Sequence, residues 1–132
     1  MKQWLSQPKP LFLIDGIGAL VSAFLLGVVL VRLEPMFGMP PEALYVLALP
    51  PCFFALYDLG CYFAPLRRPG PFLRLIALAN LGYCALSIYM VLDHAVQLTV
   101  LGWFYFMGEL LIVILLAAQE MQVARRLSAE ED

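Results

Sequence analysis

The chain has 132 residues, of which 63% are hydrophobic and only 14% charged, and its mean hydropathy is +0.86. A soluble domain has about 45–50% apolar and about 25% charged residues, so this composition could not cover a soluble surface with polar groups. The net charge of −2 and the lack of a basic stripe interleaved with aromatic side chains argue against a nucleic-acid partner. We therefore expect an integral membrane protein that is embedded in the lipid bilayer.

The first apolar segment, residues 11–33, follows Lys2 and Lys9 and has the outline of a signal peptide. Two features argue against cleavage. Asp15 interrupts the start of the segment, and the segment ends in Arg32-Leu33-Glu34-Pro35 without a small-residue cleavage site. We interpret it as an uncleaved first span.

Three further segments complete the predicted fold. Pro41-Glu42 is a favourable helix start, because proline suits the first helical position and an acid suits its positive end. We expect spans at 42–64, 72–92 and 97–119, separated by the proline-rich stretch 65–71 and by a turn at Asp93-His94. Each is close to the ~20 residues that cross ~30 Å of hydrocarbon.

The predicted fold is thus all-α: an integral membrane four-helix bundle in which residues 1–132 form a single transmembrane domain. After Ala118 the chain becomes polar but keeps good helix formers. We expect residues 120–132 to form a helical tail in the cytoplasm.

The basic residues predict the orientation of the bundle. Two lysines precede the first span, three arginines lie at the second connection and two follow the fourth span, so seven of the eight basic residues share one side. These residues are Lys2, Lys9, Arg67, Arg68, Arg74, Arg125 and Arg126. The positive-inside rule then places both termini in the cytoplasm. We expect the plasma (inner) membrane as the location.

Each span carries one strongly polar side chain in the half nearer the cytoplasm: Asp15, Asp58, Asn80 and Glu109. An acid at a helix centre costs about 2.5–3.5 kcal/mol on insertion scales. At ~5.4 Å per helical turn, the four side chains form a band roughly 10 Å deep. We expect them to face one another or a shared ligand.

Helical spacing supports inward-facing positions for these groups. Asp15 is in line with small residues, which let helices approach closely: Gly18, Ala19, Ser22, Ala23 and Gly27. The opposite face, expected to meet lipid, carries Phe12, Ile17, Leu20 and Phe24. Asn80 shares a face with Tyr83 and Ser87, and Glu109 shares one with Tyr105, which adds both tyrosines to the candidate site.

Structural explanations stay open for all four side chains, and for Glu109 the explanation is a protonated acid bonded to Asn80, Tyr83 or Asp58. Asp15 could cap the first helix in the headgroup region. Asp58 could pair with Arg67 or Arg68, and Asn80 could be a clasp between helices worth about 0.6–2 kcal/mol. Glu109 interrupts an otherwise apolar run and is the hardest to explain structurally.

Three acids at similar depth, with no lysine or arginine inside the bundle, cannot all be ionised. We expect Glu109 to be protonated at neutral pH unless a cation is bound. Exchange of a proton for a cation is the chemistry of coupled transport, and carboxylate and amide oxygens suit hard cations or an amine.

Two prolines in mid-helix, Pro50 and Pro51, remove two ladder hydrogen bonds and free the carbonyls of Val46 and Leu47. In a membrane those carbonyls need partners or must line a cavity. The sequence leaves open a hinge or a packed kink.

No cofactor is expected. A single histidine, His94, excludes a bis-histidine haem within one chain, and no span contains a lysine for a retinal-type Schiff base. The three cysteines form no CxxC motif and suit packing. Whether a metal binds stays open.

Three functional hypotheses remain. In the first, the bundle binds or transports a cation, a proton or a small polar amine through Glu109, Asp58 and Asn80. In the second, it is a non-catalytic accessory or scaffold subunit of a membrane complex, with a structural polar band. In the third, an intramembrane enzyme uses Glu109 or Asp58 as acid or base, which the lack of a nucleophile or metal set disfavours. Because one bundle is small for a transport path, a homo-oligomer or larger membrane complex is also expected.

Overall fold

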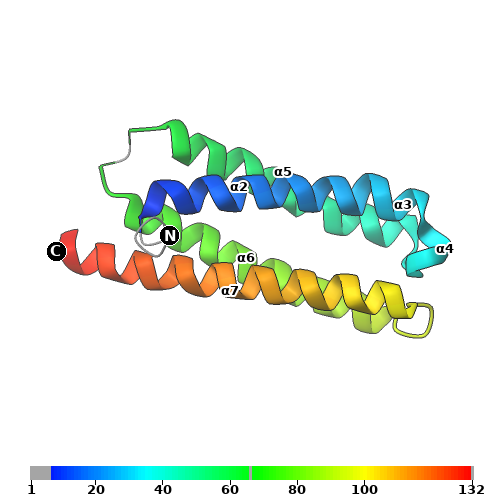
Figure 1. The fold of residues 1–132 in the computed structure, drawn as a ribbon. Helices are drawn as coiled ribbons and strands as arrows, with labels where there is room; N and C mark the ends of the chain where they lie inside the picture. Colours follow the sequence, from blue (N-terminus) through cyan, green and yellow to red (C-terminus); the bar gives the residue numbers. More distant parts are fainter. Residues whose placement is uncertain (1–6, 66, 132) are drawn as a thin grey trace.

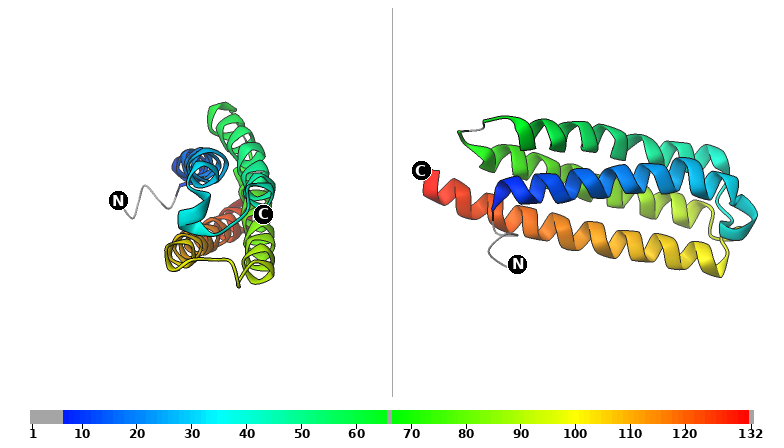
Figure 2. Two further views of the ribbon diagram at one scale, coloured as in Figure 1. Left: turned by 90° about the vertical axis from the view of Figure 1, so that its right-hand side faces the viewer. Right: turned by 45° about the horizontal axis from the view of Figure 1, so that its top comes forward.

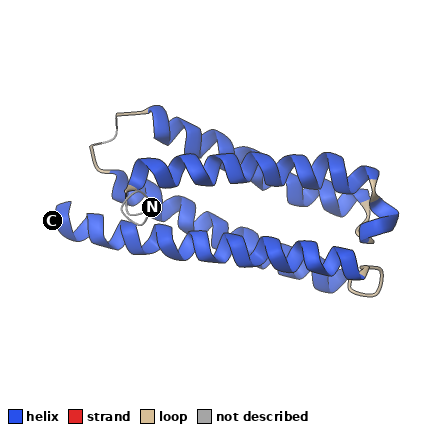
Figure 3. Ribbon diagram, viewed as in Figure 1, coloured by secondary structure: helices blue, strands red, loops and turns tan. Residues whose placement is uncertain are grey.

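The computed structural model describes residues 7–65 and 67–131, and every regular element in that part of the chain is a helix (Figure 3). Helix α2 (Pro8–Phe24) continues through a π-helical segment, η1 (Leu25–Val29), into α3 (Leu30–Arg32). The remaining elements are α4 (Glu34–Phe37), α5 (Pro41–Phe63), α6 (Pro69–Asp93) and α7 (Val100–Glu131). Residues 8–32, 41–63, 69–93 and 100–130 are each long and apolar enough to cross a membrane. The predicted all-helical architecture with four long apolar helices is confirmed.

Two predicted boundaries agree with the structure, whereas the starts of the first, third and fourth helices differ from the prediction. The first and third helices, expected from residues 11 and 72, each begin three residues earlier, at Pro8 and Pro69. Helix α5 starts at Pro41, and a turn follows Asp93. The fourth helix, predicted to begin near Gln97, begins at Val100. Thr99 is the reason, because its hydroxyl oxygen accepts a hydrogen bond from the N–H of Gly102 at 3.1 Å and so caps the helix.

The four long helices pair as two hairpins. Helices α2 and α5 pack along their length, as do α6 and α7, and contacts between the two pairs are sparser (Figure 1). Seen from one end, the helices occupy the corners of a four-helix bundle (Figure 2). The start of α2, the α5–α6 connection and the end of α7 lie at one end, with α4 and the 94–99 turn at the other.

Small residues bring α2 and α5 together. A Cβ added to Gly16 would lie 3.2 Å from the Cβ of Asp58, and one added to Gly27 would lie 3.4 Å from the Cβ of Ala48. The predicted small-residue row is only partly right, because Gly18 has no atom of α5 within reach of an added Cβ. Gly16, which follows Asp15 directly and was not part of the predicted row, makes the close contact with Asp58.

The predicted lipid face of the first helix is wrong at one position. Ile17, Leu20 and Phe24 are exposed, as expected, but Phe12 is fully buried. Phe12 clusters with Leu73 of α6 and with Val123 of α7. The part of α7 around Val123 therefore covers the start of α2, although this segment was expected to form a cytoplasmic tail.

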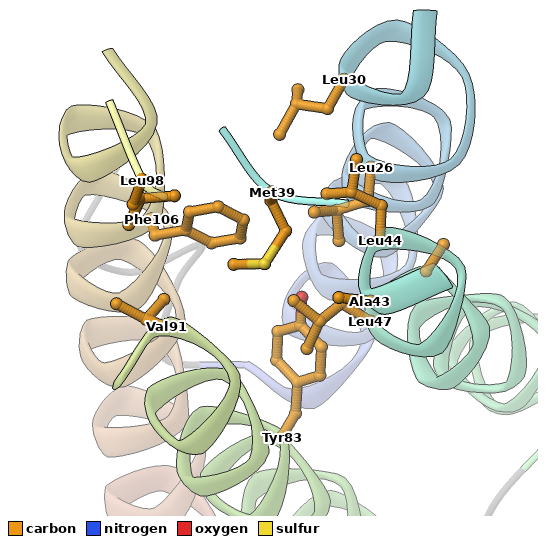
Figure 4. Close-up of a cluster of buried hydrophobic side chains, with 11 residues drawn as sticks. Leu26, Leu30, Met39, Ala43, Leu44, Leu47, Tyr83, Val91, Leu98 and Phe106 are labelled. Carbon is orange, nitrogen blue, oxygen red and sulfur yellow. The ribbon is translucent and has the colours of Figure 1, made fainter. Parts of the chain in front are cut away.

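A hydrophobic cluster fills the end of the bundle near α4. Figure 4 shows Met39, from the segment after α4, pointing between Phe106 of α7 and Leu47 of α5. Met39 is fully buried, as are both of these neighbours. An unbranched thioether adapts to such an irregular gap, so Met39 joins the two hairpins through apolar contact.

The same end is closed by backbone contacts at Thr99. The N–H of Thr99 donates to the carbonyl of Phe37 at 3.1 Å, and its hydroxyl donates to the carbonyl of Met36 at 2.5 Å. Gly38 then turns the chain with a φ of +84°, a conformation that glycine adopts at little cost. A Cβ added to Gly102 would lie only 2.1 Å from the carbonyl oxygen of Phe37.

We predict that Gly102→Ala destabilises the bundle by about 1–3 kcal/mol, because the new methyl group would collide with backbone. Gly82→Ala, on α6, is the matched control, since no atom lies within 4 Å of its added Cβ. Thermal unfolding in detergent checks both variants. Equal stability of the two would contradict the close approach at Gly102.

Candidate functional site

Polar side chains meet at two levels between the hairpins. At the first, Asn80 of α6 bridges two other helices. Its Nδ2 donates to Asp15 of α2, at 3.1 Å from Oδ1 and 3.3 Å from Oδ2, and to Oε1 of Glu120 of α7, at 3.1 Å. All three side chains are buried, and Glu120 completely so.

Asp58 of α5 completes this first group, which we call the acid cluster (Asp15, Asp58, Asn80 and Glu120). The carboxyl groups of Asp58 and Glu120 both interact with that of Asp15. Asp58 is completely buried, and among the described residues neither of its carboxyl oxygens has a hydrogen-bond partner. Oε2 of Glu120 likewise has none there.

The second group surrounds Glu109 of α7. Tyr83 of α6 donates to its Oε1 at 2.5 Å, and Ser22 of α2 donates to its Oε2 at 3.3 Å. The hydroxyl of Tyr105, one turn earlier on α7, lies beside the same carboxyl group. Glu109 is only partly buried, in contrast to Asp58 and Glu120.

A cavity of about 460 Å³ lies between the hairpins and reaches both groups. Glu109, Ser22, Tyr83 and Tyr105 line it, as do Asp15 and Asn80 of the acid cluster. The rest of its wall is apolar or glycine: Gly18, Ala19, Val21, Leu25, Pro51, Phe54, Gly108, Ile112, Val113 and Leu116. Asp58 and Glu120 are not part of the wall.

The cavity opens between α2 and α7. Val21 of α2 and Ile112 of α7 both line it and are also exposed on the outer surface, at 51% and 66%. Both residues lie within apolar helices that are long enough to span a membrane. The opening therefore faces the side that hydrocarbon would cover.

The structure divides the predicted band into two groups. Asp15, Asp58 and Asn80 lie together, whereas Glu109 lies with the predicted residues Tyr83 and Tyr105. The position of each residue along its helix had placed all four side chains in one band, and it did not show that Glu109 belongs to a separate level. The shared cavity connects them only through Asp15 and Asn80.

Two of the structural explanations are not what the structure shows. Asp15 does not cap its helix, because α2 begins seven residues earlier at Pro8. Asp58 does not pair with Arg67 or Arg68, because its carboxyl group faces Asp15 and Glu120 instead. The other two are compatible with the geometry, since Asn80 joins three helices and Glu109 is bonded to Tyr83.

Glu120 was missed as a site residue because the polar sequence after Ala118 was assigned to a cytoplasmic tail. The structure shows instead that Glu120 and the following Val123 and Ala124 are buried against the other helices. Spacing along α7 held the signal: Glu109, Val113, Leu116 and Glu120 follow one another at four, three and four residues. Such a row lies on one helix face.

The two mid-helix prolines leave α5 unbroken from Pro41 to Phe63. Pro51 is buried and lines the cavity, whereas Pro50 does not. The Sγ of Cys52, the next residue, donates to the carbonyl of Ala48 at 3.4 Å. The hinge stays a prediction.

Among the described residues, no group of three or more histidine, cysteine, aspartate or glutamate side chains is arranged to hold a metal ion. No known family model, curated protein or solved structure matches this chain.

We predict that Asn80→Leu destabilises the protein by about 1–3 kcal/mol, because it leaves two buried carboxyl groups without their N–H donor. Ser87→Ala is the matched control on the same face of α6: Ser87 is completely buried, and its Oγ has no partner among the described residues. Removal of the Ser87 hydroxyl group is expected to leave the stability of the protein unchanged. Unfolding in detergent measures both, and a neutral Asn80→Leu would refute the bridging role.

Proposed function

We propose that the protein binds a small protonated amine with an apolar body at Glu109, in exchange for a proton. The observation that carries this proposal is a partly buried carboxyl group in an otherwise largely apolar cavity whose lining includes exposed apolar residues of α2 and α7. A concave apolar site with a few convergent polar groups is the usual form of a small-molecule site.

The hydroxyl groups around Glu109 support a proton exchange. Serine and tyrosine hydroxyls both donate and accept hydrogen bonds. Ser22 and Tyr83 can therefore donate to the carboxylate while a cation is bound, and one of them can accept from the carboxylic acid after the cation leaves. None of the described residues that line the cavity is basic, so the bound cation would be the counter-charge of Glu109.

The cavity wall favours an organic cation among the ligands that the sequence left open. A hard metal ion takes about six or more oxygen ligands in a compact shell. Here the polar groups come from three helices and are divided between two levels of a 460 Å³ space whose remaining wall is mostly apolar. An ammonium group could pair with Glu109 while its hydrocarbon part fills the apolar region.

We predict that hexylamine stabilises the wild-type protein in detergent and that Glu109→Gln abolishes this effect. At one hundred times its Kd, a ligand of the folded state adds about 2.7 kcal/mol. The stabilisation should increase with pH while Glu109 loses its proton and the amine stays charged, because only the carboxylate pairs with the ammonium group. Thermal unfolding at several pH values measures it.

Hexanol is the matched ligand control, since it has the same chain without the charge, and sodium chloride tests an inorganic cation. Tyr83→Phe should weaken the hexylamine effect without removing it, because it deletes one of the hydroxyl groups. Equal stabilisation by hexylamine of the wild type and Glu109→Gln would refute the proposed site.

We further propose that both termini are cytoplasmic and that the membrane is the plasma (inner) membrane. Lys9, Arg67, Arg68 and Arg125 belong to the end of the bundle that contains the α5–α6 connection, whereas Arg32 belongs to the other end. This asymmetry supports the orientation that the positive-inside rule predicts.

In a cysteine-free background, Val96→Cys should react with a membrane-impermeant maleimide in intact cells, and Arg125→Cys only after permeabilisation. Val96 is fully exposed in the turn before α7, and Arg125 is exposed at the opposite end. The reverse labelling pattern would contradict the orientation.

The accessory-subunit hypothesis has one observation in its favour. Asn80 connects α2, α6 and α7 by hydrogen bonds, as a structural clasp would. That role is compatible with a binding site at Glu109, because Glu109 takes no part in those bonds. A chain that binds no amine and co-purifies with a membrane partner would favour the accessory role.

A further inference from the structure

We propose that the acid cluster is a closed proton-binding site, in which Asp58 and Glu120 each hold one proton and both donate to the carboxylate of Asp15. This inference is independent of amine binding at Glu109. It assigns a second ligand, the proton, to the two acids of the cluster that do not line the cavity, Asp58 and Glu120.

The hydrogen-bond pattern leads to this arrangement. The two N–H groups of Asn80 are used by Asp15 and by Oε1 of Glu120. Within the cluster, three oxygens then remain buried and without a donor among the described residues: Oε2 of Glu120 and both carboxyl oxygens of Asp58. Each of these carboxyl groups lies beside Asp15.

A proton on Oε2 of Glu120 turns that unpartnered atom into a donor, and the neighbouring acceptor is Asp15. A proton on either oxygen of Asp58 does the same. Asp15 then accepts from Asn80, Asp58 and Glu120, which a carboxylate can do because its two oxygens offer about four acceptor positions. Two protons reduce the charge of the cluster from −3 to −1.

A proton fits this site better than a metal ion or an organic cation. Asp58 and Glu120 are fully buried and do not line the cavity, so a larger ligand has no described route to them. The described acids are also not arranged to hold a metal ion. The other titratable neighbours are Tyr57 and Cys61 of α5, and none of the three carboxyl groups interacts with a basic side chain among the described residues.

The arrangement leaves the negative charge on the one carboxyl group of the cluster that faces the cavity. Asp15 lines the cavity wall together with Asn80, whereas the protonated groups lie behind them. Protons could therefore reach the cluster through Asp15 without any opening of the fold.

Infrared spectroscopy tests the proposal, because the C=O stretch of a protonated carboxyl group is separate from the carboxylate bands. At neutral pH, Asp58→Asn and Glu120→Gln should each lose one protonated-carboxyl component of the wild-type spectrum. Glu130→Gln, on the exposed part of α7, is the matched control and should lose none. Retention of the full intensity in either cluster variant would overturn the proposal.

A second measurement needs no variant within the cluster. In protein labelled with 13C-aspartate, part of the protonated-carboxyl band should shift, and 13C-glutamate in a Glu109→Gln background should shift another part. Unshifted bands in either sample would overturn the assignment, as would a cluster that is ionised and stabilised by sodium ions.

The free energy of unfolding should depend on pH through the protons on Asp58 and Glu120. Asp58 and Glu120 are protonated in the folded protein but ionised in an unfolded chain at neutral pH, so the folded state is expected to lose stability as pH rises. The double variant Asp58→Asn/Glu120→Gln should melt at a temperature that changes less between pH 7 and 10 than that of the wild type. Parallel pH profiles would contradict the two-proton assignment.

Discussion

The placement of four carboxyl groups between two apolar hairpins is the constraint on which the rest of the structure depends. Asp15, Asp58, Glu109 and Glu120 come from three of the four long helices. Their interactions in the described structure are with amide, hydroxyl and other carboxyl groups, not with basic side chains. Since an unpaired buried charge is costly, each carboxyl group needs a donor, a proton or a cation.

The two groups meet this requirement in different ways. Glu109 has a shell of hydroxyl groups and remains partly exposed to a cavity that can admit a small molecule. Asp58 and Glu120 are completely buried away from the cavity wall, and in our proposal a proton on each of them provides the hydrogen bond that its unpartnered oxygen lacks. Carboxyl groups thus suit a cation site at one level and a proton site at the other, because Glu109 lines the cavity whereas Asp58 and Glu120 do not.

Much of the fold could be predicted from the sequence. Four apolar segments of about 20 residues and the proline-rich breaks between them determine the spans, and Pro41 marks a helix start by local chemistry alone. The cap at Thr99 was missed because apolar residues lie on both sides of it, at Leu98 and Val100. The burial of Phe12 was missed because it depends on the last turns of α7.

The candidate site was only partly predictable. Residue type and helix face selected Asp15, Asp58, Asn80, Glu109, Tyr83 and Tyr105, but they could not show which helices are neighbours at each level. Glu120 lies where the sequence becomes polar, and composition alone therefore assigned it to the tail. Its spacing from Glu109, however, places both side chains on the same face of α7. Gly16, rather than Gly18, makes the close α2–α5 contact, because a shift of two residues turns a side chain to another face.

The most direct test of this account is a solid-state NMR measurement of the carboxyl 13C shifts of Glu109, Asp58 and Glu120 in lipid bilayers, with and without hexylamine. We expect the amine to shift Glu109 to its carboxylate value and to leave Asp58 and Glu120 at the values of protonated acids. A common response of all three groups, or none at Glu109, would contradict the division into an open cation site and a closed proton site.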